Sequence, residues 1–374
     1  MKDTNHIKIL HIAQAAGGVE RYLQMLLDSI DTNKYQNIVI CSSDYDKNYL
    51  KKNKIKYYEI NLKRSIGISD FVAAIEVRKL IKKISPDIIY CHSSKGGAIG
   101  RLANIGLHYK CIYNPHGWAF NMNCNKIKKS LYSIIEKILA SFCDSIVCIS
   151  GAEKKSALDN KISPEEKLIV IENGIDIDKY QLDTMIYRKE LNIPEDAYVV
   201  GTVARLSEQK APDIFIKMAE KVKDKIPNAF FIMVGDGEER EKIESFIENS
   251  NLKNSVIITG WINNPFSYMK IFDVGLLLSR WEGFGLVLAE YMLAKIPIVV
   301  TEIDAIPYII ENEKNGLLVK VDDILEATKA VIRLHDDIDL CNKMIVNGFK
   351  IVKEKYDIKR VASEHEELIE RILL

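Results

Sequence analysis

Short apolar runs alternate with longer amphipathic stretches along the whole chain. The apolar runs predict strands, and stretches with apolar residues at helical spacing, such as 19–30, 71–84 and 131–142, predict helices between them. The predicted strands are 7–13, 37–42, 57–60, 87–91, 111–114, 145–149, 168–171, 198–203, 230–234, 255–259, 274–278, 298–300 and 316–319. Alternation of this kind predicts α/β domains whose parallel sheets carry helices on both faces.

A polar stretch divides this pattern into two halves. The charged residues 188–190 precede Pro194, and apolar strands resume at residue 198. At 374 residues the chain is about two domains long, so each half is large enough for its own core. Doubly wound domains bind ligands outside the carboxyl ends of their strands. The predicted organisation is a first domain 1–180, a linker 181–195, a second domain 196–355 and a C-terminal helix 356–374.

The composition, 47% apolar and 28% charged, is typical of a soluble globular protein. The formal net charge is zero, so no general attraction to nucleic acid is expected. Charge is uneven, however, because residues 1–178 carry 26 Lys+Arg against 19 Asp+Glu. Within this basic half, segment 126–139 (KIKKSLYSIIEKIL) begins with lysines and has apolar residues at helical spacing. We interpret it either as a peripheral contact with anionic lipid or as a core helix with a solvated face.

The cysteines and the length of the apolar runs indicate a cytoplasmic protein. Seven cysteines stand singly, and several, such as Cys41 and Cys148, lie in strand-like runs where a thiol fills core space. This usage favours a reducing compartment and disfavours a structural zinc site. The apolar run near the start is too short for a signal peptide, and no stretch reaches the roughly 18 apolar residues of a membrane span. The inner face of the cell membrane is the one membrane surface that such a protein would contact.

Two glutamates eight positions apart enclose a glycine loop in the segment EGFGLVLAE, residues 282–290. Gly283 and Gly285 flank Phe284 where the backbone must turn, and a helix is predicted from Leu286 onward. Free amides at a helix start can face a diphosphate. A sugar and a ribose each present neighbouring hydroxyls, and a carboxylate can accept hydrogen bonds from both. One glutamate for each ring is our interpretation; a surface glutamate beside an ordinary core helix is the alternative.

This segment resembles the glutamate-x7-glutamate signature of the family-four retaining glycosyltransferases, the group 1 type found in bacterial capsule, exopolysaccharide and lipopolysaccharide assembly. The resemblance implies the GT-B fold, in which two Rossmann-like domains face a central cleft and the last helix packs back across the domain junction. It also implies that Glu282 holds the donor sugar and Glu290 the ribose. The donor-binding set then includes Gly283, Phe284, Gly285 and Leu286.

Two segments of the first half resemble further parts of that family. Gly17 and Gly18 follow strand 7–13 and precede a helix, like the family's amino-terminal loop over the donor diphosphate. His116 follows strand 111–114 in NPHGW, like the family's H-G motif, and is expected to bind a sugar hydroxyl and support charge near the anomeric carbon. A plain tight turn and a structural histidine are the alternatives.

In the second half, Arg205 and Lys210 follow strand 198–203 and resemble the family's G-R-L then K pattern. Both are expected to reach the donor diphosphate, arginine as a planar fork and lysine as a point charge. Because such a pair replaces a metal ion, no metal is expected, and Asp176-Ile-Asp178 is interpreted as an inter-domain turn. Gly235 matches the family's G-x-G turn near the base. Salt-bridged surface side chains are the alternative for the two cations.

One segment departs from the family pattern. After strand 298–300 the family has a glycine pair and then a glutamate, whereas this chain has Ala305-Ile306-Pro307-Tyr308. A missing glycine is expected to exclude a left-handed backbone turn or a very close ligand approach.

Together these residues and the resemblance imply a retaining, metal-independent hexosyltransferase with His116, Arg205, Lys210 and Glu282 as catalytic residues. The expected donor is a nucleoside diphosphate sugar, with uridine diphosphate first and guanosine diphosphate mannose second, and no other cofactor is expected. The expected acceptor is a hydroxyl of a saccharide or lipid-linked saccharide, and the resemblance implies that the leaving phosphate takes its proton. The alternatives are a non-catalytic GT-B partner that binds glycan and a nucleotide-sugar epimerase.

Overall fold

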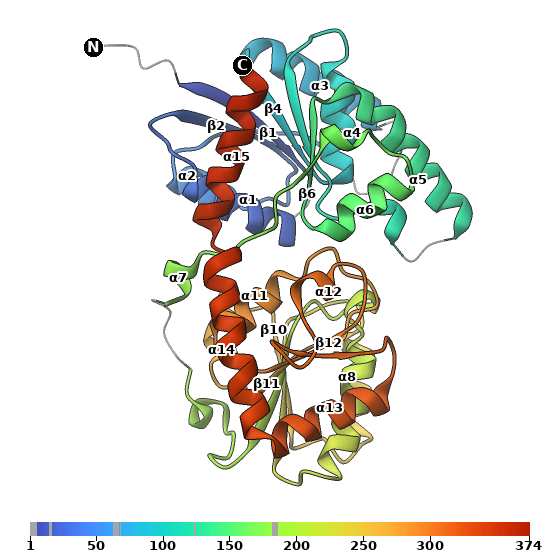
Figure 1. Ribbon diagram of the computed structural model, residues 1–374, viewed down its shortest axis with the longest axis vertical. Coiled ribbons are helices and arrows are strands. Elements are labelled where there is room, and N and C mark those ends of the chain that lie inside the picture. Colours follow the sequence, from blue (N-terminus) through green and yellow to red (C-terminus); the bar gives the residue numbers. More distant parts are fainter. Residues whose placement is uncertain (1–5, 15–16, 63–66, 68, 123–124, 182–185) are drawn as a thin grey trace. The chain divides into compact units, whose positions relative to one another are not determined.

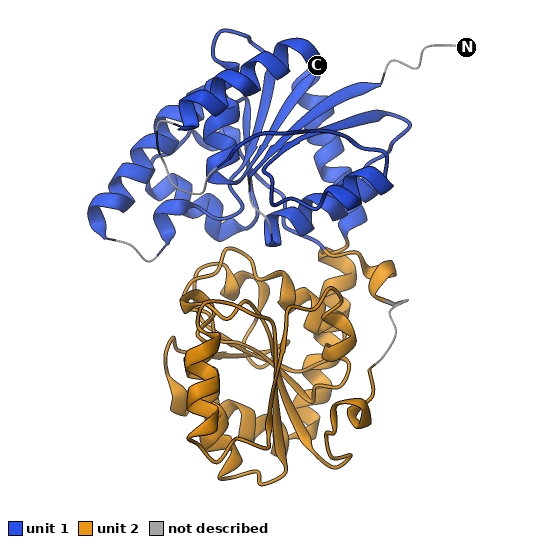
Figure 2. Ribbon diagram, turned by 180° about the vertical axis from the view of Figure 1, so that it is seen from behind, with its two compact units in different colours: residues 1–174, 358–374 blue, residues 175–357 orange. Residues whose placement is uncertain are grey.

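The computed structural model describes residues 6–14, 17–62, 67, 69–122, 125–181 and 186–374. The chain forms two compact units, residues 1–174 with 358–374 (unit 1) and residues 175–357 (unit 2), coloured separately in Figure 2. Each unit contains one sheet in which all recorded strand pairs are parallel, and helices surround each sheet (Figure 1). The predicted pair of doubly wound α/β domains is therefore confirmed.

Unit 1 has a seven-stranded sheet in the order β3-β2-β1-β4-β5-β6-β7. Because the order reverses between β1 and β4, the connecting helices fall on both faces. The strands are β1 Ile7–Ala13, β2 Tyr35–Cys41, β3 Lys56–Glu59, β4 Ile88–His92, β5 Lys110–Asn114, β6 Ser145–Cys148 and β7 Leu168–Val170. The helices are α1 Gly18–Ser29, α2 Lys47–Lys52, α3 Ser69–Ile84, α4 Ser93–Asn104, α5 Lys126–Leu139, α6 Gly151–Asp159 and α15 Ile358–Leu373.

Unit 2 has a six-stranded sheet in the order β10-β9-β8-β11-β12-β13, which reverses between β8 and β11. The strands are β8 Tyr198–Val203, β9 Ala229–Val234, β10 Val256–Gly260, β11 Val274–Leu277, β12 Ile298–Thr301 and β13 Leu317–Val319. The helices are α7 Ile177–Gln181, α8 Pro212–Lys223, α9 Arg240–Glu248, α10 Phe266–Met269, α11 Leu286–Leu293, α12 Ile306–Ile309, α13 Ile324–Asp336 and α14 Ile338–Lys355. Every predicted strand is present in the two sheets, with ends shifted by at most two residues.

The boundary between the units differs from the predicted linker 181–195, of which residues 182–185 lie outside the described part. The described residues of this segment belong to unit 2. Arg188 explains their attachment, since its guanidinium donates to the carbonyl oxygen of Ala197 at 2.8 Å and to Asp273 Oδ2 at 2.8 Å. The chain instead leaves unit 1 after Gly174 and returns to it at Ile358.

The final helix α15 belongs to unit 1, where it packs against α1. His365 lies on its buried face, with Nε2 2.7 Å from the hydroxyl of Tyr22. The hydroxyl of Tyr35 donates to Glu370 Oε1 at 3.0 Å. The predicted C-terminal helix is therefore present, and it packs against α1 and contacts Tyr35 of β2.

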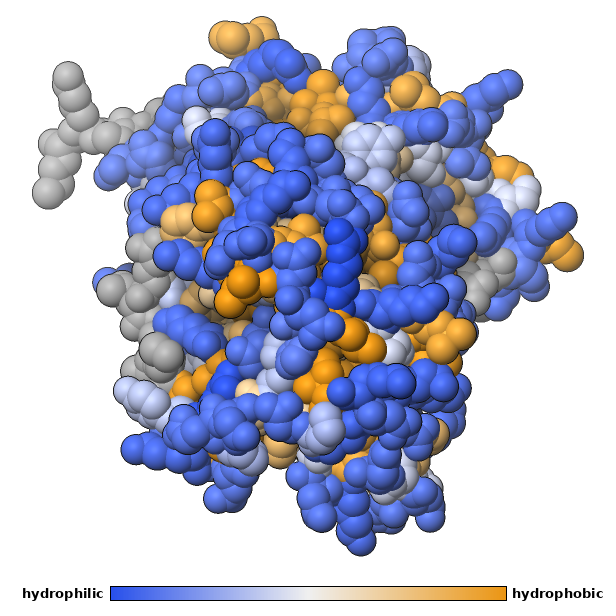
Figure 3. All heavy atoms as spheres, turned by 60° about the horizontal axis from the view of Figure 1, so that its bottom comes forward, coloured by the Kyte–Doolittle hydropathy of each residue, from blue (hydrophilic) through white to orange (hydrophobic). Residues whose placement is uncertain are grey.

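The surface is mixed in character. On the face drawn in Figure 3, hydrophobic side chains form small groups among hydrophilic ones. Within the described part of the chain, no helix combines the length and the apolarity that a membrane crossing needs.

Candidate active site

Lys210 and Glu282 form an ion pair where the strand order of unit 2 reverses. Lys210 follows β8 and Glu282 follows β11, and these two strands are neighbours at the reversal. Lys210 Nζ donates to Glu282 Oε2, and the hydroxyl of Ser279 donates to the same oxygen at 3.2 Å. The carboxyl ends of strands at such a reversal are where doubly wound sheets bind ligands. The two residues that sequence patterning assigns to the diphosphate and the sugar therefore meet at this end of the sheet.

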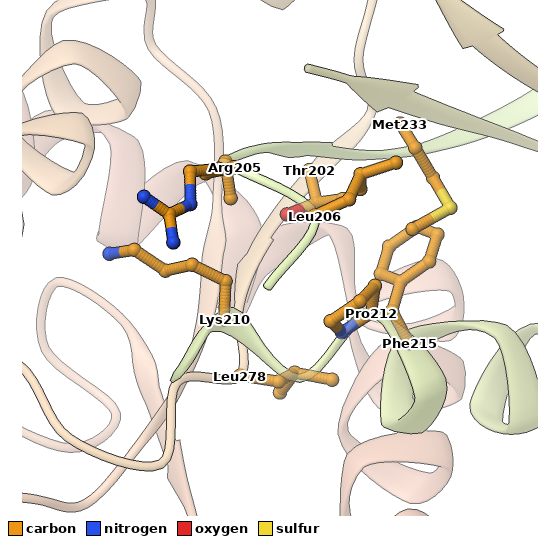
Figure 4. Close-up of a pocket in the computed structure, with 9 residues that line it drawn as sticks. Thr202, Arg205, Leu206, Lys210, Pro212, Phe215, Met233 and Leu278 are labelled. Carbon is orange, nitrogen blue, oxygen red and sulfur yellow. The ribbon is translucent and has the colours of Figure 1, made fainter. Parts of the chain in front are cut away.

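Arg205 lies on the loop between the same strand β8 and Lys210. Its Nη2 donates to Glu238 Oε1 at 2.8 Å, with both side chains about half exposed. Both cations line one small pocket and extend to the same side of it, away from Leu206 and Met233 (Figure 4). An exposed ion pair of this kind contributes about 1 kcal/mol or less, so phosphate oxygens can displace Glu238 at little cost.

Gly235 holds the loop after β9 against the loop that carries Arg205. Its φ is 146°, and a Cβ atom there would lie 2.0 Å from the carbonyl oxygen of Ala204. The amide of Leu206 donates to the Asp236 carbonyl oxygen at 2.9 Å, which joins the two loops. A side chain at position 235 would push the Arg205 loop away, so glycine is required for packing.

The EGFG segment turns the chain from β11 into α11. Gly285 caps the helix with φ 77°, and Leu286 is the first helical residue. Phe284 is buried and its ring packs edge-on against Tyr356, with centroids 5.4 Å apart. Phe284 is thus fixed in the protein interior, while the half-exposed Gly283 lies between it and Glu282.

Glu290 lies in the second turn of α11 and is 1% exposed. The hydroxyl of Tyr180 donates to its Oε1 at 2.9 Å. A contact between Glu290 and a ribose stays a prediction, and it would use a carboxylate that this tyrosine already orients.

Ala305 and Ile306 stand where the family has its glycine pair, and neither forms a left-handed turn, since Ala305 has φ −83° and Ile306 begins α12. Asp304 adopts φ 41° without a glycine, and its Oδ2 accepts the amide N–H of Glu282 at 2.9 Å. Aspartate is one of the few residues other than glycine that adopt this conformation. Ala305 and Ile306 are buried and Tyr308 is half exposed. The departing segment therefore supports the Glu282 loop directly.

In unit 1, Gly17 and Gly18 begin α1 after β1. Gly17 has φ 98°, which favours glycine, and among the described residues no atom other than those of the chain neighbours lies within 4 Å of a Cβ built on either residue. The space where a side chain on Gly17 or Gly18 would stand is therefore open toward the described residues. This openness is compatible with ligand approach.

His116 sits in a strained loop after β5, with φ 53°. Its amide donates to Asn114 Oδ1 at 3.0 Å, and its ring Nε2 lies 3.1 Å from His92 Nδ1. The residue as a whole is partly exposed, and burial of its imidazole lowers its pKa. His116 is therefore a neutral imidazole near pH 7.

Glu153 on α6 holds the loop of His116, and sequence patterning missed it. Its Oε1 accepts the amide of Gly117 at 2.7 Å and its Oε2 accepts the amide of Ile149 at 2.6 Å. Burial raises the pKa of Glu153 to about 7, against the opposing effect of these two donors. The available signal was the capping pattern Ser150-x-x-Glu153, in which the Ser150 hydroxyl accepts the Glu153 amide.

Comparison with known proteins agrees with this architecture. The family described as Glycosyltransferase Family 4 matches residues 16–179, and the one described as Glycosyl transferases group 1 matches residues 183–351. Anabaena HepE, crystallised with UDP and glucose, has the same fold with a TM-score of 0.84 at 21% identity, over 98% of this chain and 100% of that one. The fold is thus that of the GT-B glycosyltransferases.

Two relatives each match most of the sequence. An Escherichia coli UDP-Gal:alpha-D-GlcNAc-diphosphoundecaprenol alpha-1,3-galactosyltransferase is 30% identical over 96% of this chain and 97% of its own length. An uncharacterised 41.2 kDa protein of the cps region of Klebsiella pneumoniae is 31% identical over 85% of this chain and 87% of its own. The chain belongs to the group 1 glycosyl transferases.

Proposed function

We propose that this glycosyltransferase moves a sugar from a UDP-sugar to a hydroxyl of a saccharide or lipid-linked saccharide in cell-surface polysaccharide assembly. We further propose that it retains the anomeric configuration and needs no metal ion. The observation that carries the proposal is the Lys210–Glu282 pair at the carboxyl ends of β8 and β11, with Arg205 on the same loop as Lys210. These residues combine two cations for a diphosphate with a carboxylate for a sugar.

Arg205 and Lys210 act on the leaving group. Charge grows on the diphosphate as the glycosidic bond breaks, and fixed cations that stabilise this charge lower the barrier. In the free protein each cation is held by a carboxylate, Glu238 for Arg205 and Glu282 for Lys210. Binding of the diphosphate releases Glu282, whose oxygens are then free to accept hydrogen bonds from sugar hydroxyls. The leaving phosphate oxygen takes the acceptor proton, so no side-chain base is assigned.

UDP-galactose and a lipid-linked N-acetylglucosamine diphosphate are the first substrates to test. The Escherichia coli relative uses this pair of substrates according to its name, and it matches this chain over nearly its full length. The α linkage in that name is also the configuration of galactose in UDP-galactose. Retention is the simplest relation between such a donor and such a product.

The test uses the full chain with radiolabelled UDP-galactose, UDP-glucose and GDP-mannose, each with and without a lipid-linked N-acetylglucosamine diphosphate. Transfer from a UDP-sugar to an α-linked product, unchanged by EDTA, is the expected result. An inverted product refutes retention, and loss of activity with EDTA refutes metal independence. Glycan binding without transfer or hydrolysis instead supports a glycan-binding partner, and epimerised donor supports an epimerase.

Helix α5 supports a location at an anionic membrane, because its apolar face points outward. Ile127, Leu131, Ile134 and Ile138 recur at intervals of three or four residues and are 80%, 50%, 53% and 58% exposed. The opposite face carries the buried Glu136, which accepts from Arg101 Nη2 at 2.8 Å. At 100° per residue the four apolar side chains fall within an arc of about 60°. This arrangement supports the interpretation of α5 as an interfacial helix.

Charged side chains flank this apolar stripe. Lys126 and Lys137 follow one edge and Lys128 the other. Burying the four aliphatic groups is worth roughly 5 kcal/mol before the cost of association. Each lysine near an anionic surface adds about 1 kcal/mol. We therefore assign the membrane contact of unit 1 to α5.

Vesicle flotation tests this assignment. We expect binding to vesicles that contain anionic lipid and loss of binding in the variant Ile127→Gln/Ile134→Gln. Ile338→Gln is the matched control, since Ile338 is 73% exposed on α14 of unit 2. Equal binding of the double variant and the control refutes the role of α5, and equal binding to neutral vesicles refutes the role of its lysines.

A further inference from the structure

A row of four hydrogen-bonded side chains crosses the sheet of unit 1 and ends at His116. Asn37 Oδ1 lies 3.0 Å from His11 Nε2, His11 Nδ1 lies 3.1 Å from His92 Nε2, and His92 Nδ1 lies 3.1 Å from His116 Nε2. These residues come from β2, β1, β4 and the loop after β5, which are consecutive in the sheet. The row therefore spans the point at which the strand order of unit 1 reverses.

The imidazoles of this row are neutral. His11 and His92 are fully buried, and the ring of Tyr90 stacks on His92 with centroids 4.4 Å apart. Burial lowers the pKa of His11 to about 4, and burial with the neighbouring histidines lowers the pKa of His92 well below its usual value. A fourth histidine, His365, is engaged separately with the hydroxyls of Tyr22 and Tyr90. A neutral imidazole has one N–H donor and one nitrogen acceptor, so each ring passes on a hydrogen bond in one direction only.

Asn37 decides this direction. The amide oxygen can only accept, so His11 carries its proton on Nε2 and its Nδ1 accepts. His92 must then donate from Nε2 and accept at Nδ1. By the same step His116 donates from Nε2.

We propose that Asn37, His11 and His92 are positioning residues that fix the tautomer of His116, with the proton on Nε2 and the lone pair on Nδ1. Since Nε2 is engaged with His92, Nδ1 is the ring nitrogen that a ligand meets. A hydroxyl that donates to it is favoured, whereas a carbonyl or phosphate oxygen is repelled. The part of the proposal that makes this hydroxyl a sugar hydroxyl rests on the proposed function.

The tautomer is measured directly by ¹⁵N NMR of protein labelled in its seven histidines, because imidazole nitrogens with and without a proton resonate far apart. A His116→Gln variant assigns the signals. At pH 8 we expect the unprotonated signal on Nδ1 of His116 and the protonated signal on Nε2. A proton on Nδ1 overturns the proposal.

Asn37 offers a matched pair of variants at the far end of the row. Asn37→Asp keeps an acceptor, so the His116 signals should stay where they are. Asn37→Leu removes the acceptor, and both His116 signals should move toward the average of the two tautomers. If the leucine variant does not fold, Asn37→Ser replaces it, because a hydroxyl can donate or accept and so no longer fixes the direction of the hydrogen bonds. We call whichever of the two is used the releasing variant. Identical His116 signals in the releasing variant and in Asn37→Asp overturn the proposal, whether or not the protein transfers sugar.

Kinetics separate a tautomer effect from a structural one. If the releasing variant populates the correct tautomer about half of the time, apparent affinity for the sugar donor falls about twofold and kcat is unchanged. A tenfold loss of kcat with unshifted NMR signals would show that Asn37 acts on structure alone. Failure of the proposed function shows as absence of transfer in the unaltered protein, while the NMR result still stands.

Discussion

Replacing Lys210 with methionine is expected to damage turnover far more than stability. The substitution leaves an unbranched side chain one atom shorter and removes the cation that Glu282 contacts. Loss of one fixed charge beside a leaving diphosphate costs about 3 kcal/mol, or 10²- to 10³-fold in kcat. The side chains of Lys210 and Glu282 are 20% and 9% exposed, so the pair is more buried than a surface ion pair but not fully buried. A surface pair contributes about 1 kcal/mol or less, and breaking a fully buried pair costs about 3–5 kcal/mol. We therefore expect a stability loss of roughly 2 kcal/mol.

A double variant separates these two effects. In Lys210→Met/Glu282→Gln no buried carboxylate is left unpaired, so urea unfolding followed by tryptophan fluorescence should return toward the unaltered protein. Turnover of the labelled donor should stay low, because the cation is still missing. Lys217→Met is the matched control, since Lys217 makes only a loose 3.8 Å surface pair with Asp213. Unaltered kcat in Lys210→Met, or an equal loss in the control, would refute the assigned role of Lys210.

Three further predictions concern unit 1. Glu153→Gln turns one acceptor oxygen into an NH₂ group that faces the amide N–H of Gly117 or Ile149. Since two donors then face each other, we expect the free energy of unfolding in urea to fall by about 1–3 kcal/mol. An unaltered unfolding midpoint would contradict this account. Glu136→Gln leaves the guanidinium of Arg101 buried without its carboxylate and should cost about 3 kcal/mol or more in thermal unfolding, whereas Arg101→Met/Glu136→Leu should recover most of it. Burial lowers the pKa of His11 in the folded protein to about 4, below its ordinary value of 6.5. The neutral ring therefore stabilises the folded state fully above pH 6.5, and this stabilisation, about 3 kcal/mol of unfolding free energy, is lost as the pH falls through 4. A His11→Gln variant with the same pH dependence of unfolding would contradict this.

The strands were predictable because buried parallel strands are almost continuously apolar. Helix α4 was not, because Gly96, Gly97 and Gly100 resemble a loop in the sequence. A Cβ on Gly97 would lie 2.2 Å from the ring of Tyr113, and one on Gly100 would lie 2.3 Å from Cys91 Sγ. These glycines allow the helix to press against the sheet. Close packing of this kind overrides low helix propensity, and no local pattern reports it.

The candidate site was predictable where each residue follows a strand, as Arg205, Lys210 and Glu282 do. Their partners in the free protein were not. Lys210 and Glu282 are 72 positions apart, and the pair exists only because β8 and β11 are neighbours in the sheet. Asp304 illustrates the same limit, since its support of the Glu282 loop is a contact across 22 positions that no local pattern reports.

Both units join two titratable side chains across the point where the strand order reverses, but the two pairs differ in kind. In unit 1 His11 and His92 are fully buried, so an ion there would lose its hydration and the neutral hydrogen bond is favoured. In unit 2 Lys210 and Glu282 keep some contact with water, so the ion pair is retained. An ion pair can exchange one partner for the charge of a ligand, whereas a row of neutral imidazoles can only transmit the direction of a hydrogen bond. Under the proposed function, this difference in burial suits unit 2 to bind the diphosphate and unit 1 to orient a hydroxyl.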